Sequence, residues 1–286
     1  MKELRNLRPD NQNGHKDIVT KDTLLNVYKK VIVYGNGESR MGKPLINDME
    51  SWGCNAIYRD IKVDNLVSVD YNMQQEIYES GYAHESKCYF TDWSVIPQAD
   101  DMLLDTMRIE FEPHMIHETS RENRTDCVIQ GKEPKIAQSN LKEALDKNPN
   151  LDYNDLRLKA EMNVGLYITW VDEKDMVNDI DYPTQWSAGN TALHLACQGG
   201  VNEIYMLGFD SSDYKEPLNN MYKGSANYLP ETAKGFNPVN WNNQLNTLFN
   251  EYNNVKFKWV GSVHKMTGEY LNVEYIAYEN LYYYNK

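Results

Sequence analysis

Several polar residues follow short apolar runs in this chain, and their types suit the binding of a phosphorylated ligand. The first group is the Gly35-Asn36-Gly37 turn, with Ser39 close behind, after the apolar run Val31-Ile32-Val33. Glycines permit positive φ and a close approach of a ligand to the backbone, and consecutive amides can bind a phosphate. The same turn is equally typical of an ordinary connection from a strand to a helix, because short motifs have a high false-positive rate.

The remaining groups have the same placement at the ends of predicted strands or at the start of a predicted helix. They are Asn55, Asp70, Ser187, Gly189, Asn190 and Asp210. Open parallel sheets bind ligands beyond the carboxyl ends of their strands, near a topological switch point. Each of these residues could equally form a turn or cap a helix. Their joint placement predicts a site for a nucleotide or a nucleotide-sugar.

Strands alternate with helical segments along most of the chain. Apolar runs predict strands near residues 30–34, 54–58, 65–70, 87–90, 165–172, 203–207 and 255–260, and helical patterns cover 72–79, 187–199 and 241–252. This alternation predicts an α/β, Rossmann-like, mostly parallel sheet with helices on both faces. We expect an N-terminal arm at 1–29 and a domain at 30–286, with an insertion or lid at about 92–160 before the strand at 165–172 resumes the sheet.

The composition disfavours several classes of protein. The 286 residues carry a net charge of −13, which weighs against sequence-independent binding to duplex DNA or to anionic membranes. The four cysteines form no Cys-x-x-Cys pair, so a zinc or redox motif is not expected. No apolar run approaches membrane-spanning length and the N-terminal residues are polar; we therefore expect a cytoplasmic protein with no membrane partner.

Two nucleotide-binding classes are disfavoured by motif. Arg40 occupies the place of the third glycine in a dinucleotide fingerprint, and no Walker lysine pattern occurs. Dehydrogenases and P-loop NTPases therefore fit this sequence poorly.

Parts of the chain resemble the bacterial sialyltransferases with a single Rossmann-like domain, and related Rossmann-like proteins of phages and bacteria. The likeness covers residues 30–70 and 185–212, and its motifs are Val31–Ser39, Cys54–Tyr58, Ser187-Ala188-Gly189 and Glu203–Asp210. The resemblance implies contacts of Asn36, Gly37 and Asn55 with the donor nucleotide. It also implies that Ser187 and Gly189 lie near the sugar or the phosphate.

The resemblance further implies catalytic residues on the loop after Asp210. Tyr222 and Tyr228 have the spacing of a tyrosine pair that hydrogen-bonds the leaving phosphate, and Tyr214 is a competing candidate. The general base of that family is a histidine on the lid, and this chain has no histidine between Asp210 and Val260. His264, or a carboxylate such as Asp213 or Glu231, replaces it, or the chemistry differs.

These features predict a glycosyltransferase that moves a sugar from a nucleotide-sugar donor to a hydroxyl acceptor. The mechanism requires no metal, although Asp70 and Asp210 could hold one. The Asn-, Tyr- and Asp-rich composition is similar to that of proteins of large T-even-type phages, which implies an acceptor that is a glycan or a modified DNA base in the host cytoplasm. The alternatives are a Mg²⁺- and ATP-dependent pyrophosphokinase-like enzyme and a catalytically inactive Rossmann-like binding module.

Overall fold

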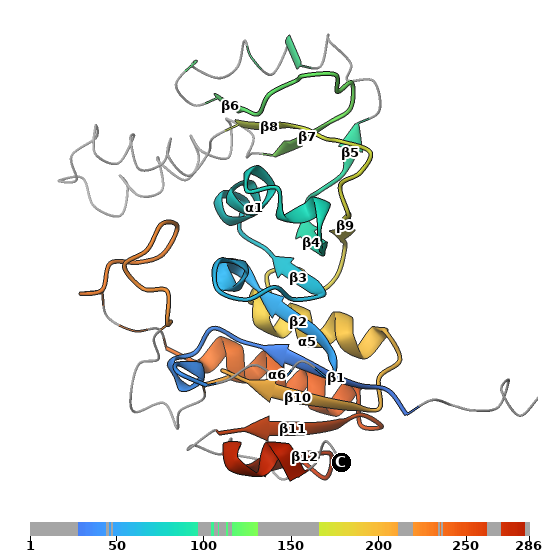
Figure 1. Cartoon of the computed structure of the whole chain (residues 1–286), viewed down its shortest axis with the longest axis vertical. Coiled ribbons are helices and arrows are strands. Elements are labelled where there is room, and N and C mark those ends of the chain that lie inside the picture. The colour runs from blue at the N-terminus through green and yellow to red at the C-terminus, as the bar shows by residue number, and fades with distance from the viewer. Residues whose placement is uncertain are drawn as a thin grey trace, which may run out of the picture.

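The computed structural model describes residues 28–43, 46, 48–96, 104, 105, 108, 113, 116–130, 166–210, 220–233, 235, 237–261 and 270–283. This part of the chain forms an eight-stranded sheet and a separate four-stranded sheet (Figure 1). The strands of the larger sheet are β1 (Lys30–Tyr34), β2 (Glu50–Cys54), β3 (Asn65–Ser68), β4 (Lys87–Thr91), β9 (Val177–Ile180), β10 (Glu203–Leu207), β11 (Lys256–Val260) and β12 (Val273–Ile276).

The larger sheet is parallel throughout, with the strand order β12-β11-β10-β1-β2-β3-β4-β9. From β1 the chain adds strands in one direction as far as β9, and then returns to add β10, β11 and β12 on the other side of β1. The order of strands therefore reverses between β1 and β10, which is the switch point where open α/β sheets bind ligands. The predicted α/β, Rossmann-like, mostly parallel architecture is confirmed.

Helices cover both faces of the larger sheet because its buried strands alternate their side chains between two apolar clusters. Ile32 of β1 packs in one cluster with Ile77 of α1 (Tyr71–Glu79). Its neighbour Val33 packs in the other cluster, with Leu193 of α5 (Ala188–Gln198) and Leu248 of α6 (Val239–Glu251). None of the helices in the described part of the chain is long and apolar enough to cross a membrane.

The smaller sheet corrects one prediction about the path of the chain. Its strands, in the order β5-β7-β8-β6, are β5 (Val95–Ile96), β7 (Cys127–Gln130), β8 (Leu166–Trp170) and β6 (Ile116–Glu118). We expected the strand at 165–172 to resume the larger sheet, and this was wrong: β8 pairs antiparallel with β7 and parallel with β6. Its residues Leu166, Ile168 and Trp170 fill a separate apolar cluster, and β9 is the strand that rejoins the larger sheet.

Helix α1 lies between the two sheets (Figure 1). Its contacts with the smaller sheet are polar: the Thr169 hydroxyl donates to Gln75 Oε1 (2.8 Å), and the Tyr78 hydroxyl donates to the Trp170 carbonyl (2.9 Å). The Gln130 amide adds a hydrogen bond of 2.6 Å to Gln74 Oε1. These hydrogen bonds pair most of the buried polar groups of the joint and so fix the position of the smaller sheet, although Gln130 Oε1 has no partner among the described residues.

A second correction concerns the strand predicted at 54–58. The strand is β2, which ends at Cys54, and the 3-10 turn η3 (Asn55–Arg59) follows directly. Asn55 has a φ of +50°, a left-handed conformation that asparagine tolerates better than most residues. The apolar residues Ala56 and Ile57 are buried from the turn rather than from a strand, which is why their pattern was misread.

Candidate functional site

The loops after β1 and β10 meet backbone to backbone at the switch point. The Gly35 amide donates to the Leu207 carbonyl (2.8 Å), and the Gly37 amide donates to the Gly208 carbonyl (2.9 Å). A Cβ added at Gly35 would lie 2.4 Å from the Gly208 oxygen, closer than any side chain can approach. Gly35 is therefore required by this contact and not by its own backbone conformation.

The backbone amides that we expected to bind a phosphate donate to protein groups instead. Besides those of Gly35 and Gly37, the Ser39 amide donates to Asp210 Oδ2 (3.1 Å). These three amides hold the two loops together, so their hydrogens already have acceptors within the protein. An anion bound at this edge would therefore need other donors.

Two asparagine oxygens at this edge are buried without a partner among the described residues: Asn36 Oδ1 and Asn55 Oδ1. Asn36 is 8 % exposed, and its Nδ2 donates to the Cys54 carbonyl (2.8 Å), which orients its oxygen away from that carbonyl. Asn55 hydrogen-bonds the Asp70 carboxylate. Buried acceptors without donors are costly in folded proteins, so these two oxygens are open to a group that supplies an N–H or O–H.

Asp70 lies at the start of α1, directly beyond β3, in an extended conformation. Its side chain is exposed at the surface. Desolvation by neighbouring groups raises the pKa of this carboxyl, and the hydrogen bond from Asn55 opposes the shift. A carboxylate with a raised pKa is better suited to accept a proton than an ordinary aspartate.

A loop at residues 220–229, called the tyrosine loop below, is attached to this edge. Asn220 forms a β-bridge with Gly37, and the Met221 amide donates to the Asn36 carbonyl (3.0 Å). Lys223 Nζ lies 2.7 Å from Glu38 Oε1. In Figure 1 the orange loop that contains these residues lies on the side toward which the arrowheads of β1, β2 and β10 point.

The second attachment of the tyrosine loop is a network centred on Glu76 of α1. Arg59 donates to both carboxylate oxygens of Glu76 (2.7 and 2.6 Å) and also to Ser225 Oγ (2.8 Å). Asn227 Nδ2 donates to Glu76 Oε2 (2.6 Å), and the Tyr58 hydroxyl donates to Oε1 (2.6 Å). The loop is thus held to η3 and α1 by hydrogen bonds that converge on one carboxylate.

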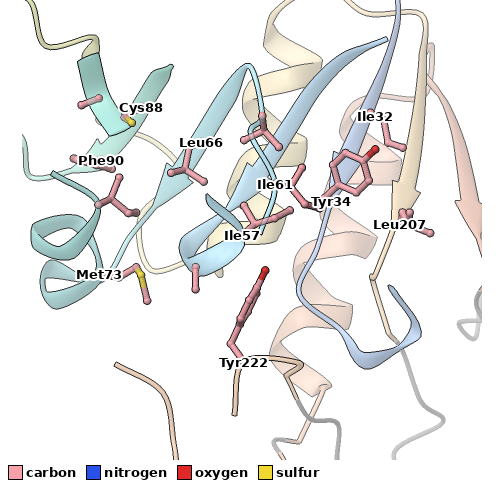
Figure 2. Packing of buried hydrophobic residues seen from close by; sticks show 14 of the residues in the cluster. Ile32, Tyr34, Ile57, Ile61, Leu66, Met73, Cys88, Phe90, Leu207 and Tyr222 are labelled. Carbon is pink, nitrogen blue, oxygen red and sulfur yellow. The ribbon is translucent and has the colours of Figure 1, made fainter. Parts of the chain in front are cut away.

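This loop brings Tyr222 and Tyr228 together, with ring centroids 5.8 Å apart. Figure 2 shows the Tyr222 side chain pointing from its loop toward the sheet, near Ile57. The Tyr228 hydroxyl accepts from the Ala56 amide (3.4 Å) and interacts with Asn36. Burial raises the pKa of Tyr228 to about 12 and also raises that of Tyr222, so both hydroxyls keep their protons at neutral pH and can donate to an anion.

The start of α5 reaches the same edge. Ser187 caps the helix by accepting from the Asn190 amide (3.3 Å), as predicted. A Cβ added at Gly189 would lie 3.4 Å from the Phe209 ring and 3.8 Å from Cys54 Sγ, which places Gly189 beside the ends of β2 and β10. Asn190 is not brought to the site: its side chain is 2 % exposed and donates to the Trp241 carbonyl (3.1 Å), joining α5 to α6.

The sequence did not indicate Arg40 as a residue of this site, and the predicted residue His264 has no described position. Arg40 is 5 % exposed and was considered only as a departure from a glycine pattern. A charged residue directly after a Gly-x-Gly turn was the available signal, but its burial is a tertiary property. His264 lies outside the described residues, as do Asp213 and Tyr214.

The described residues contain no group of three or more His, Cys, Asp or Glu side chains that could hold a metal ion. No protein-family model, curated protein or solved structure matches this chain. The class that can be stated is therefore the one that fold and geometry define: an α/β, Rossmann-like protein with asparagine oxygens, tyrosine hydroxyls and a buried arginine at the switch point of its sheet.

Proposed function

We propose that the protein is a glycosyltransferase whose nucleotide-sugar donor binds at the carboxyl edge of the sheet, beside the switch point between β1 and β10. The observation that supports this proposal most directly is the pair of buried, unpartnered oxygens of Asn36 and Asn55. Ribose hydroxyls and the N–H groups of a nucleobase are donors that such oxygens bind. The neighbouring Tyr222 and Tyr228 hydroxyls are donors and suit the phosphate of the same ligand.

The proposed reaction needs charge stabilisation and a base. As the bond between the anomeric carbon and the phosphate oxygen breaks, its electron pair stays on the phosphate, where Tyr222 and Tyr228 stabilise the new charge. The acceptor hydroxyl loses its proton to a base, and its oxygen forms the new bond to the anomeric carbon. Asp70 is the described carboxylate that best suits this base, because it lies at the edge beside Asn55 and its pKa is raised.

Titration calorimetry with CMP-, UDP- and GDP-sugars tests the proposal, and one donor is expected to bind at micromolar or lower Kd. Mass spectrometry then follows the release of the nucleotide as the sugar is transferred, first to water and then to glycan or modified-DNA acceptors. Asn36→Asp is expected to weaken binding about tenfold or more, because it removes the donor to the Cys54 carbonyl and places a negative charge beside the ligand. Absence of binding to all donors would refute the proposal.

Asn178→Asp is the matched control for that variant. Asn178 also donates its side-chain amide to a cysteine carbonyl, that of Cys88 (3.3 Å), but it does so on the edge strand β9. Wild-type donor affinity is expected in this variant. The same panel includes ATP with Mg²⁺: release of AMP would favour a pyrophosphokinase, whereas binding without turnover of any ligand would favour a binding module.

A further inference from the structure

The buried guanidinium of Arg40 makes no direct ion pair with the residues that the structure describes. Its Nε donates to the Gly35 carbonyl (3.0 Å), and its Nη2 donates to the Tyr222 hydroxyl (3.0 Å) and contacts Met221 Sδ (2.8 Å). A carbonyl, a hydroxyl and a thioether are all neutral. Arginine is almost never fully buried without an anionic partner, since burial of an isolated charge is costly.

The other cations around the tyrosine loop behave differently. Arg59 pairs with Glu76, and Lys223 pairs with Glu38. Both have side chains that are more exposed than Arg40, so their need for a partner is smaller, and yet each has a carboxylate. Of these three cations, buried Arg40 is the one whose hydrogen-bond partners are all neutral, and it lies at the switch point of the sheet.

Tyr222 connects this charge to the proposed substrate site. It accepts a hydrogen bond from Arg40, and its ring lies against that of Tyr228. The exposed carboxylate of Asp60 also interacts with the Tyr222 hydroxyl. An anion that displaced Asp60 would accept a hydrogen bond from the Tyr222 hydroxyl and would lie beside the guanidinium of Arg40.

We propose that Arg40 and Tyr222 together form the anion subsite of the protein, in which Arg40 supplies the positive charge and positions the Tyr222 hydroxyl toward a phosphate. This inference rests on the proposed function for the identity of the ligand, but not for the existence of the subsite. It assigns the phosphate to side chains, because the Gly35, Gly37 and Ser39 amides are engaged with the loop after β10. A purely structural Arg40 would tie two loops together and would have no effect on the choice between charged and uncharged ligands.

The test measures the affinity for inorganic pyrophosphate, and for cytidine and uridine against CMP and UDP, in the full chain by calorimetry. Arg40→Met and Tyr222→Phe are expected to bind pyrophosphate about 10- to 100-fold more weakly than the wild type, the range for loss of a charge-assisted hydrogen bond. The preference for a nucleotide over its nucleoside should fall by a similar factor. Arg40→Lys keeps the charge and should bind pyrophosphate more tightly than Arg40→Met.

The matched control is Arg108→Met, which removes an arginine that pairs with Glu118 of the smaller sheet. Its affinity for pyrophosphate should equal that of the wild type. If Arg40→Met does not fold by circular dichroism, Arg40→Lys and Tyr222→Phe decide the question. The inference is overturned if the wild type binds no pyrophosphate, if Arg40→Met binds it as the wild type does, or if Arg40→Lys is as weak as Arg40→Met.

The two proposals fail separately in these measurements. A wild type that binds pyrophosphate through Arg40 but binds no nucleotide-sugar would refute the glycosyltransferase and support the anion subsite. A wild type that binds a nucleotide-sugar with an affinity that Arg40→Met leaves unchanged would support donor binding and refute the anion subsite.

Discussion

Replacing Gly35 by alanine tests whether the loops after β1 and β10 are in contact at the switch point. The added methyl group would lie 2.4 Å from the Gly208 oxygen and 3.0 Å from the Gly208 carbonyl carbon. Both are backbone atoms, so no side chain can rotate away to make room. The φ of Gly35 is outside the left-handed region, and the whole effect therefore comes from this contact.

The expected loss of stability follows from two terms. Overpacking of a close contact costs about 1–3 kcal/mol. If the loops separate, the hydrogen bonds from Gly35 to Leu207 and from Gly37 to Gly208 weaken, and each contributes about 1 kcal/mol. We expect the free energy of unfolding to fall by about 2–5 kcal/mol, a large share of the roughly 5–15 kcal/mol that stabilises a typical domain.

Denaturant titration followed by circular dichroism measures this loss, provided that the m-values of the variants agree. The matched variant is Gly189→Ala, whose methyl group would lie at an ordinary 3.4 Å from the Phe209 ring. Because it replaces glycine in α5, it should be neutral or should stabilise the protein by up to about 1 kcal/mol. If Gly35→Ala were within about 0.5 kcal/mol of the wild type, the observed contact between the two loops would be wrong.

Two further predictions concern titratable groups away from that contact. Burial raises the pKa of Glu76, but hydrogen bonds from Arg59, Tyr58 and Asn227 outweigh this effect and lower the pKa overall. Glu76→Gln should therefore reduce the free energy of unfolding by about 1–3 kcal/mol and speed proteolysis within the tyrosine loop. The control Glu85→Gln, at an exposed carboxylate, should change neither. Burial lowers the pKa of His194, and the charge of Glu251 opposes this, so the unfolded chain binds the proton more tightly. Stability should be complete above about pH 6.5 and should be lost as the pH falls below it; the drop in Tm between about pH 7.5 and about pH 5.5 should be smaller in His194→Gln, and an equal drop would contradict the assignment.

Much of the larger sheet was predictable because parallel strands that are buried on both faces form continuous apolar runs. The runs at Val31–Val33 and Ile204–Leu207 are central strands in the structure, and Ser187 caps the helix that was predicted to follow it. The two errors have one origin. An apolar stretch shows that a segment is buried but not whether it is buried from a strand or a turn, as at Ala56 and Ile57, nor which sheet it joins, as for β8.

The sequence by itself determined the residue types at the carboxyl ends of the strands, because Gly, Asn and Asp directly after apolar runs are visible in one dimension. It therefore indicated Asn36 and Asn55 as candidates, whereas the resemblance to the sialyltransferases implied the tyrosine pair. Only the tertiary structure decided which atoms remain available: the loop amides bond to β10 and Asp210, Asn190 joins two helices, and Arg40 is buried against Tyr222. Hydrogen-bond partners and burial depend on residues far apart in the chain, and local patterns do not contain that information.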